Sequence, residues 1–215
     1  MKQQTEIENI DFSFIAKRND KIIKPFEDLV LNVISNGDIK TNDFVWSWMA
    51  NIIQNPQVKN KTALILQGET KASGKSTFVQ IFSQLIKGYY INPIDKKTIF
   101  SHSNNHLLNK LCLYYEGDIQ VFSKDELKHL EYLITQDKLI YRKKSNQPKV
   151  SQNYLNFIID SNITHERVEE FFTILNISNC KSGNTEFFDN LYKLASQKDF
   201  MEALMYKLST YDITK

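Results

Sequence analysis

The chain has 215 residues, of which 41% are hydrophobic and 12% aromatic, and its 27 basic and 25 acidic residues leave a net charge of +2. With only six glycines and four prolines, this composition is typical of a folded protein and excludes a disordered chain or a strongly charged tail. Because the sequence shows no secretory signal, no apolar run near the roughly 18 residues of a membrane span, and two cysteines in no paired motif, we expect a cytoplasmic protein without a membrane partner.

Two helices are predicted in an N-terminal helical element, residues 1–58. Apolar residues recur at helical spacing over 26–33, behind a proline. A second amphipathic run covers 44–53, with Thr41-Asn42-Asp43 as its predicted cap and Asn55-Pro56 as its predicted end. The aromatic residues of this run are expected in the core.

Residues 59–180 alternate between short apolar runs, typical of strands buried on both faces, and helical patterns. The predicted strands are 62–67, 111–115, 154–159 and 171–177, and the predicted helices are 76–87 and a segment that follows the capping box Ser123–Glu126. This alternation favours an α/β core with a mainly parallel sheet and helices on both faces. A C-terminal helical tail, 181–215, is predicted to hold helices at 185–195 and, behind the box Ser196–Asp199, at 200–208.

The sharpest local signal is Gly68-Glu-Thr-Lys-Ala-Ser-Gly-Lys-Ser-Thr77, between a predicted strand and a predicted helix. In a phosphate-binding loop, backbone N–H groups at the helix start face the anion, Lys75 reaches the outer phosphates, and the Ser76 hydroxyl can ligate Mg²⁺. Thr77 completes the motif. The alternative interpretation is an ordinary turn with a helix cap.

The spacing of this loop is irregular. Gly68 and Gly74 enclose five residues where four are usual, so Glu69 stands at the position of the first glycine. Either the loop bulges by one residue or Glu69 replaces that glycine. A carboxylate that faced phosphates would weaken their binding.

Polar residues follow two of the predicted strands. Glu116 comes directly after the run 111–115 and is a candidate ligand of Mg²⁺, while Gly117 and then Asp118 stand where a second acid often orients the attacking water. Asn162 follows the run 154–159 and is a candidate sensor of the γ-phosphate. The alternatives are a strand-end acid exposed to solvent and an asparagine that only forms a turn.

Basic residues cluster around a polar turn between 138 and 149. Arg142, Lys143 and Lys144 are adjacent, in a chain whose net charge is only +2. Such a loop is suited to tracking the phosphates of a single nucleic-acid strand. The alternative is a solvated run of charge.

The order of these motifs resembles the superfamily 3 helicase modules of phages, viruses and mobile elements, over about residues 42–178. The resemblance rests on Trp48–Pro56, the GKST loop, His106–Leu111 ahead of Glu116, Leu133–Thr135, Lys144 in a hairpin, and a strand that ends at Ser161-Asn162. It implies an AAA+-like P-loop core that binds ATP and Mg²⁺, assembles as a ring, usually a hexamer, and translocates on single-stranded DNA.

Matched residue by residue, the resemblance implies that Lys75 and Ser76 are the Walker A lysine and hydroxyl. It makes Glu116 the metal-binding acid, Asn162 the motif C sensor and Lys144 the basic residue of the pore hairpin. Glu169 and Glu170 stand where relatives carry an arginine that reaches the neighbouring subunit. Arg167, a few positions earlier, is the remaining candidate.

The sequence therefore predicts an ATP-dependent translocase that acts in replication of a phage or mobile element, with a primase or loader as partner. The alternative is a catalytically weak ring or adaptor that binds nucleotide or DNA, since the long loop, Gly117 and the shifted arginine all concern hydrolysis. A small-molecule P-loop kinase would need an arginine-rich lid, which is not visible. His102 and His106 share a helical spacing but have no third metal ligand in sight.

Overall fold

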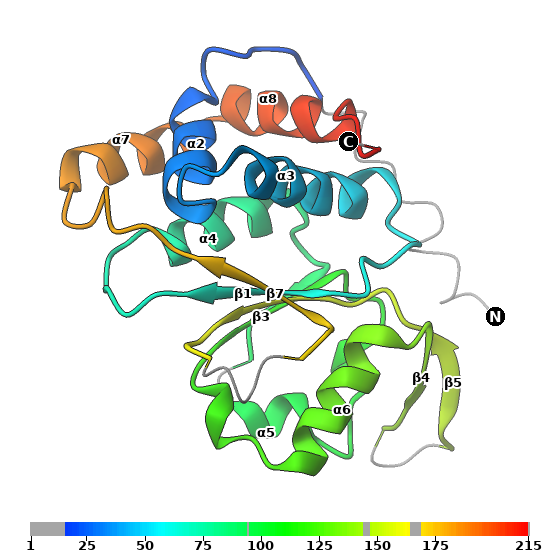
Figure 1. Cartoon of the computed structure of the whole chain (residues 1–215). Coiled ribbons are helices and arrows are strands. Elements are labelled where there is room, and N and C mark those ends of the chain that lie inside the picture. Colours follow the sequence, from blue (N-terminus) through cyan, green and yellow to red (C-terminus); the bar gives the residue numbers. More distant parts are fainter. Residues whose placement is uncertain (1–15, 94, 144–146, 164–168, 215) are drawn as a thin grey trace. The chain divides into compact units, whose positions relative to one another are not determined.

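The computed structural model describes residues 16–93, 95–143, 147–163 and 169–214 (Figure 1). The chain divides into two compact units. Within the described residues, the first unit comprises 56–65 and 86–174, and the second comprises 16–55, 66–85 and 175–214. The division predicted from the sequence, after residues 58 and 180, stays a prediction.

Five strands form one sheet with the order β2-β3-β6-β1-β7. Their bounds are β1 Ala63–Gln67, β2 Tyr90–Ile91, β3 Cys112–Glu116, β6 Asn156–Asp160 and β7 Phe172–Asn176. Strands β2 and β3 pair in parallel, as do β3 and β6. Hydrogen bonds from Ala63 N to Phe171 O and from Ile177 N to Gln67 O show that β7 runs parallel to β1. The predicted α/β class with a mainly parallel sheet is confirmed.

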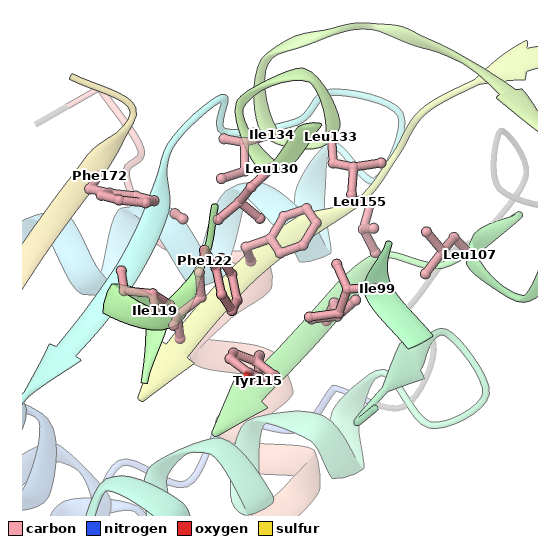
Figure 2. Packing of buried hydrophobic residues seen from close by; sticks show 14 of the residues in the cluster. Ile99, Leu107, Tyr115, Ile119, Phe122, Leu130, Leu133, Ile134, Leu155 and Phe172 are labelled. Carbon is pink, nitrogen blue, oxygen red and sulfur yellow. The ribbon is translucent and has the colours of Figure 1, made fainter. Parts of the chain in front are cut away.

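The first unit has a core of apolar residues from β3, β6 and the helices that follow β2 and β3 (Figure 2). These helices and turns are α5 Lys96–Ile99, η3 Asn105–Leu107, η4 Ile119–Val121 and α6 Lys124–Thr135. The capping box of Ser123 and Glu126 is present at the start of α6. Helix α6 contributes Leu130, Leu133 and Ile134 to this core, so its amphipathic pattern determines which face is buried.

A two-stranded antiparallel hairpin follows α6 in the first unit. Strand β4 covers Lys138–Tyr141 and β5 covers Lys149–Gln152, with Ile140 opposite Val150. The alternating burial of β4 buries Leu139 and Tyr141 and exposes its other two side chains. The hairpin predicted around the basic cluster is therefore present.

The second unit is built from helices around aromatic residues. Its elements are α2 Lys24–Asp28, the π-helix η2 Leu29–Ile34, α3 Ile39–Gln54, α4 Lys75–Leu85, α7 Thr185–Ala195 and α8 Lys198–Ser209. The fully buried Phe26 ring stacks on Phe78 of α4 at 6.1 Å and packs edge-on against Trp46 and Phe200. Large aromatic contacts of this kind dominate the energetics of a core.

Two predicted helix caps are wrong. Helix α3 begins at Ile39, and its cap is Asp38, whose carboxylate accepts the N–H of Thr41 at 2.7 Å. Helix α8 begins at Lys198 after Gln197, which makes no side-chain cap hydrogen bond. Local cap patterns fail here because several polar residues precede each helix and the neighbouring turn selects among them.

Among the helices of the described ranges, none is both long and apolar enough to cross a membrane. Cys112 is buried and Cys180 exposed, and both are free thiols.

Candidate phosphate-binding loop and neighbouring sites

The loop predicted to bind phosphate joins β1 to α4 within the second unit. Residues 69–72 are exposed, whereas Ser73 and Gly74 are buried. Ala72 adopts a φ of 54° and Gly74 a φ of 111°. The segment that contains Glu69 and the additional residue is therefore exposed to solvent. The Nζ of Lys75 donates a hydrogen bond to the Gly68 carbonyl at 2.7 Å, which draws its ammonium across the loop.

Gly74 is required by packing as well as by conformation. A Cβ atom at this position would lie 2.8 Å from Leu29 Cδ1 and 3.2 Å from a ring carbon of Phe188. Its φ lies in the region that side-chain-bearing residues rarely adopt. The start of α4 can therefore approach η2 and α7 only with glycine at this position.

The loop carries groups of the kind that bind an anion. The Ser73 side chain is buried, and its Oγ has no hydrogen-bond partner within the described residues. Helix α4 starts at Lys75, and the first N–H groups of an α-helix lack partners within the helix. A buried hydroxyl, a helix N-terminus and an ammonium group together suit the oxygens of a phosphate.

Helix α7 and the turn before it contact this loop at three places. The Thr77 and Tyr192 hydroxyls are hydrogen-bonded at 2.8 Å, and Ser182 Oγ donates to the Lys71 carbonyl at 3.2 Å. Phe188 packs near Gly74. Sequence reasoning missed these residues because they lie more than a hundred positions from the loop and no local pattern marks them.

The polar strand ends predicted in the first unit lie on adjacent strands. In the parallel pair β3·β6, Glu116 is opposite Asp160, and the Gly117 N–H donates to the Asp160 carbonyl at 3.1 Å. A Cβ on Gly117 would lie 2.5 Å from the Tyr115 hydroxyl, so the Tyr115 side chain would have to move to admit it. Sequence reasoning gave Asp160 no role, although the register pairs it with Glu116.

Asp118 and Asn162 belong to the same group of strand ends. Asp118 accepts the N–H of Gln120 at 2.8 Å and thereby caps η4. The buried Ser161 hydroxyl accepts the N–H of Ile119 at 3.0 Å and donates to the Asn162 carbonyl at 3.2 Å. The structure therefore brings Glu116, Asp118 and Asn162 to the carboxyl ends of two neighbouring strands.

The basic cluster is only partly described. Arg142 and Lys143 follow β4, while Lys144 lies outside the described residues, as does Arg167. The buried Asn104 side chain accepts the Arg142 N–H at 2.8 Å and donates to the Ile140 carbonyl at 3.0 Å. The Asn104 side chain therefore satisfies one N–H and one carbonyl at the end of β4, as the backbone of a neighbouring strand would.

Of the two histidines considered as metal ligands, His106 makes a hydrogen bond to the backbone. The His106 Nε2 lies 3.1 Å from the Thr98 carbonyl, which gives this side chain a structural hydrogen bond. In the ranges that the structure describes, no three His, Cys, Asp or Glu side chains are grouped closely enough to hold a metal ion.

Comparison with known proteins shows the fold of this chain. A family of unknown function, DUF5906, matches residues 66–171. No curated protein matches the sequence. Among solved structures, the chain is similar to an A-form apo structure of the NrS-1 C-terminal region, with a TM-score of 0.72 and 21% identity over 98% of this chain.

Two further apo structures of the same NrS-1 region give TM-scores of 0.70 and 0.67, at 19% and 21% identity over 98% and 94% of this chain. The chain spans about half the length of these neighbours, 50%, 50% and 48% respectively. At this level of identity, the likeness shows a shared fold.

Proposed function

We propose that this protein is a P-loop ATPase that translocates on single-stranded DNA during replication of a phage or mobile element. The observation that carries the proposal is the loop 68–77 at the N-terminus of α4, where the buried Ser73 Oγ has no partner among the described residues and the Lys75 ammonium lies at the Gly68 carbonyl. Such an arrangement suits the phosphates of a nucleotide. The fold shared with the NrS-1 C-terminal region supports the assignment.

The residues of the loop would bind and orient ATP. The Lys75 ammonium would leave the Gly68 carbonyl and neutralise the outer phosphates, and the Ser76 hydroxyl would bind Mg²⁺. Magnesium, when bound, supplies positive charge to the phosphate oxygens. Residues 69–72 are exposed, and a bulge there would keep the additional residue away from the phosphates.

Glu116 is proposed as the acid that holds the metal, and Asp118 and Asn162 as the residues that position water. Their position at or just after the ends of β3 and β6 supports this assignment, because ligands of parallel α/β sheets bind outside the carboxyl ends of the strands. Glu116 and Asp160 are also register partners on β3 and β6, and a divalent cation would stabilise two carboxylates on neighbouring strands. Arg167 of a neighbouring subunit in a hexameric ring is proposed to stabilise charge in the transition state.

ATP binding and turnover in three variants test the proposal. Lys75→Ala should weaken ATP binding roughly 10- to 100-fold, because a charge-assisted contact to phosphate is lost. Glu116→Gln should keep nucleotide binding and lose turnover. Lys87→Ala is the control, since this exposed lysine follows α4 and lies outside the loop.

Equal nucleotide binding by wild type and Lys75→Ala would contradict the proposal. Binding without turnover would instead assign the protein as a ring or adaptor without motor activity. Single-stranded DNA should stimulate turnover, and its failure to do so would favour a small-molecule kinase. The mass of the protein in solution with Mg-ATP and oligonucleotide measures whether a ring assembles. We also propose a primase or loader as partner.

A further inference from the structure

A pocket of about 430 Å³ lies in the first unit, beside the hairpin. It is lined from the loop 100–104, from α6 and from β4, and its principal side chains are Phe100, His102, His129, Tyr132, Ile140 and Arg142. Its size suits a group as large as a nucleoside. Neither the phosphate-binding loop nor the strand ends 116–118 and 160–162 contribute to it.

The aromatic side chains of the pocket are held in place. Phe100 packs edge-on against Phe122, with ring centroids 5.1 Å apart, and against His129 at 5.7 Å. The Tyr132 hydroxyl donates to the Lys138 carbonyl at 3.3 Å, while 42% of Tyr132 remains exposed. Tyr132 therefore offers a fixed and accessible ring, as base stacking requires.

The polar groups of the pocket favour an anionic strand. Arg142 lines the pocket, and its backbone is fixed by Asn104. Lys138 and Lys149 are exposed residues of the same hairpin, opposite Gln152 and Tyr141 respectively, and the acid that precedes β4, Asp137, is paired with Lys61 at 3.1 Å. Arg142 thus gives the lining of the pocket a positive charge.

We propose that this pocket binds one unstacked base of a single nucleic-acid strand, with the base against Tyr132 and the adjoining phosphate at Arg142. His102 and His129 then offer ring nitrogens to the base edge. Near neutral pH, partial burial and the nearby Arg142 lower the pKa of His129, which favours a neutral ring that can both donate and accept. The inference deepens the proposed function, since it names how the strand is bound.

Fluorescence anisotropy with a labelled oligothymidylate of about twelve nucleotides, and with an abasic strand of equal length, tests this pocket. Wild type should bind the abasic strand more weakly, and Tyr132→Ser should weaken binding of the thymidine strand roughly 5- to 30-fold. On the abasic strand, Tyr132→Ser should cause no further loss, because the base that it would contact is missing. Arg142→Gln should lower the salt slope of binding by about 0.7 on both strands.

Val121→Ser is the matched control, because Val121 is an exposed apolar residue of the same unit that does not line the pocket. It should bind both strands like wild type, and thermal unfolding verifies that each variant is folded. The titrations are run in EDTA without nucleotide and again with Mg²⁺ and a non-hydrolysable ATP analogue. They therefore do not depend on hydrolysis, and the Lys75→Ala nucleotide titration separates this proposal from the proposed ATPase.

Three results would overturn the proposed base pocket. The first is that the protein binds no strand, either in EDTA or with Mg²⁺ and the ATP analogue. The second is that Tyr132→Ser loses equal affinity for the thymidine strand and the abasic strand. The third result is tighter binding of free thymidine monophosphate than of the oligonucleotide. Unchanged strand binding by Tyr132→Ser with an altered mass in solution would assign the pocket to a protein contact and would also overturn the proposal.

Discussion

The loop 68–77 and the hairpin 138–152 are held by different kinds of contact. In the loop, the backbone conformations of Ala72 and Gly74 and close packing by Phe188 fix the shape. In the hairpin, buried polar side chains hydrogen-bond to backbone carbonyl and N–H groups along the edge of a strand, as Asn104 does along β4. The loop thus depends on steric fit, whereas the hairpin depends on hydrogen bonds that are shielded from water.

The base of the hairpin shows the same principle at the end of α6. The Asn153 amide donates to the carbonyls of Leu133 and Gln136 at 2.8 and 2.7 Å. The buried Lys59 ammonium donates to the same two carbonyls at 2.8 and 3.3 Å. Carbonyls at a helix end carry partial negative charge, so an amide and a cation suit them. The comparison teaches that steric substitutions should damage the loop most, and polar substitutions the hairpin.

The largest effect is expected for Gly74→Ala. The alanine would have to adopt a strained φ, and its Cβ would collide with Leu29. The free energy of unfolding should therefore fall by about 3 kcal/mol. Gly88→Ala is the control, since Gly88 also has a positive φ, 93°, but its Cβ would meet open space. Urea unfolding measures both variants. Similar losses in the two would contradict the steric account of the loop.

A smaller loss, about 2 kcal/mol, is expected for Asn104→Ala, because the variant removes two hydrogen bonds and leaves the Arg142 N–H without its acceptor. Asn105→Ala serves as control, since Asn105 is the exposed neighbour. Urea unfolding gives the loss, and strand binding should weaken in Asn104→Ala alone. Equal stability of the two variants would show that the buried amide does not hold β4.

Lys59 makes the stability of the hairpin region depend on pH. Burial lowers the pKa of Lys59 to about 7, opposed by the nearby Asp137 carboxylate. Between about pH 7 and the ordinary lysine pKa near 10.4, the unfolded chain binds more protons than the folded chain. The free energy of unfolding should therefore rise with pH in this window, by at most about 1.4 kcal/mol per unit.

Lys59→Met should remove this rise, as measured by urea unfolding at several pH values in the same window. Lys61→Met provides the comparison, because Lys61 is exposed and paired with Asp137. A rise that persists in Lys59→Met would assign the pH dependence to another group.

The smallest effect is expected for Tyr192→Phe. Loss of the hydrogen bond to Thr77 should cost about 1 kcal/mol of stability, because Tyr192 is partly exposed and its ring is retained. ATP affinity should fall by less than roughly tenfold, as measured by titration, since the loop keeps Gly74 and Lys75. Tyr206→Phe, on α8, is the control. A loss of ATP binding as severe as that of Lys75→Ala would mean that α7 forms part of the nucleotide site itself.

Much of the local structure follows from the sequence. The apolar run before Gly68 and the helical pattern after Gly74 predicted β1 and α4, and the capping box at Ser123 predicted the start of α6. These features depend on neighbours within a few residues, whose periodicity and hydrogen bonding are written in the chain. The same reasoning failed at Thr41, because the actual cap lies three residues earlier.

Tertiary structure alone decided which distant residues complete each site. It paired Asp160 with Glu116 across two strands and brought Tyr192 to Thr77. It also turned Asn104 and Tyr132 toward one pocket beside the hairpin. Sequence patterns cannot select such partners, because contacts between residues far apart in the chain depend on how whole helices and strands pack. Before packing, many polar residues of the chain are chemically equivalent candidates.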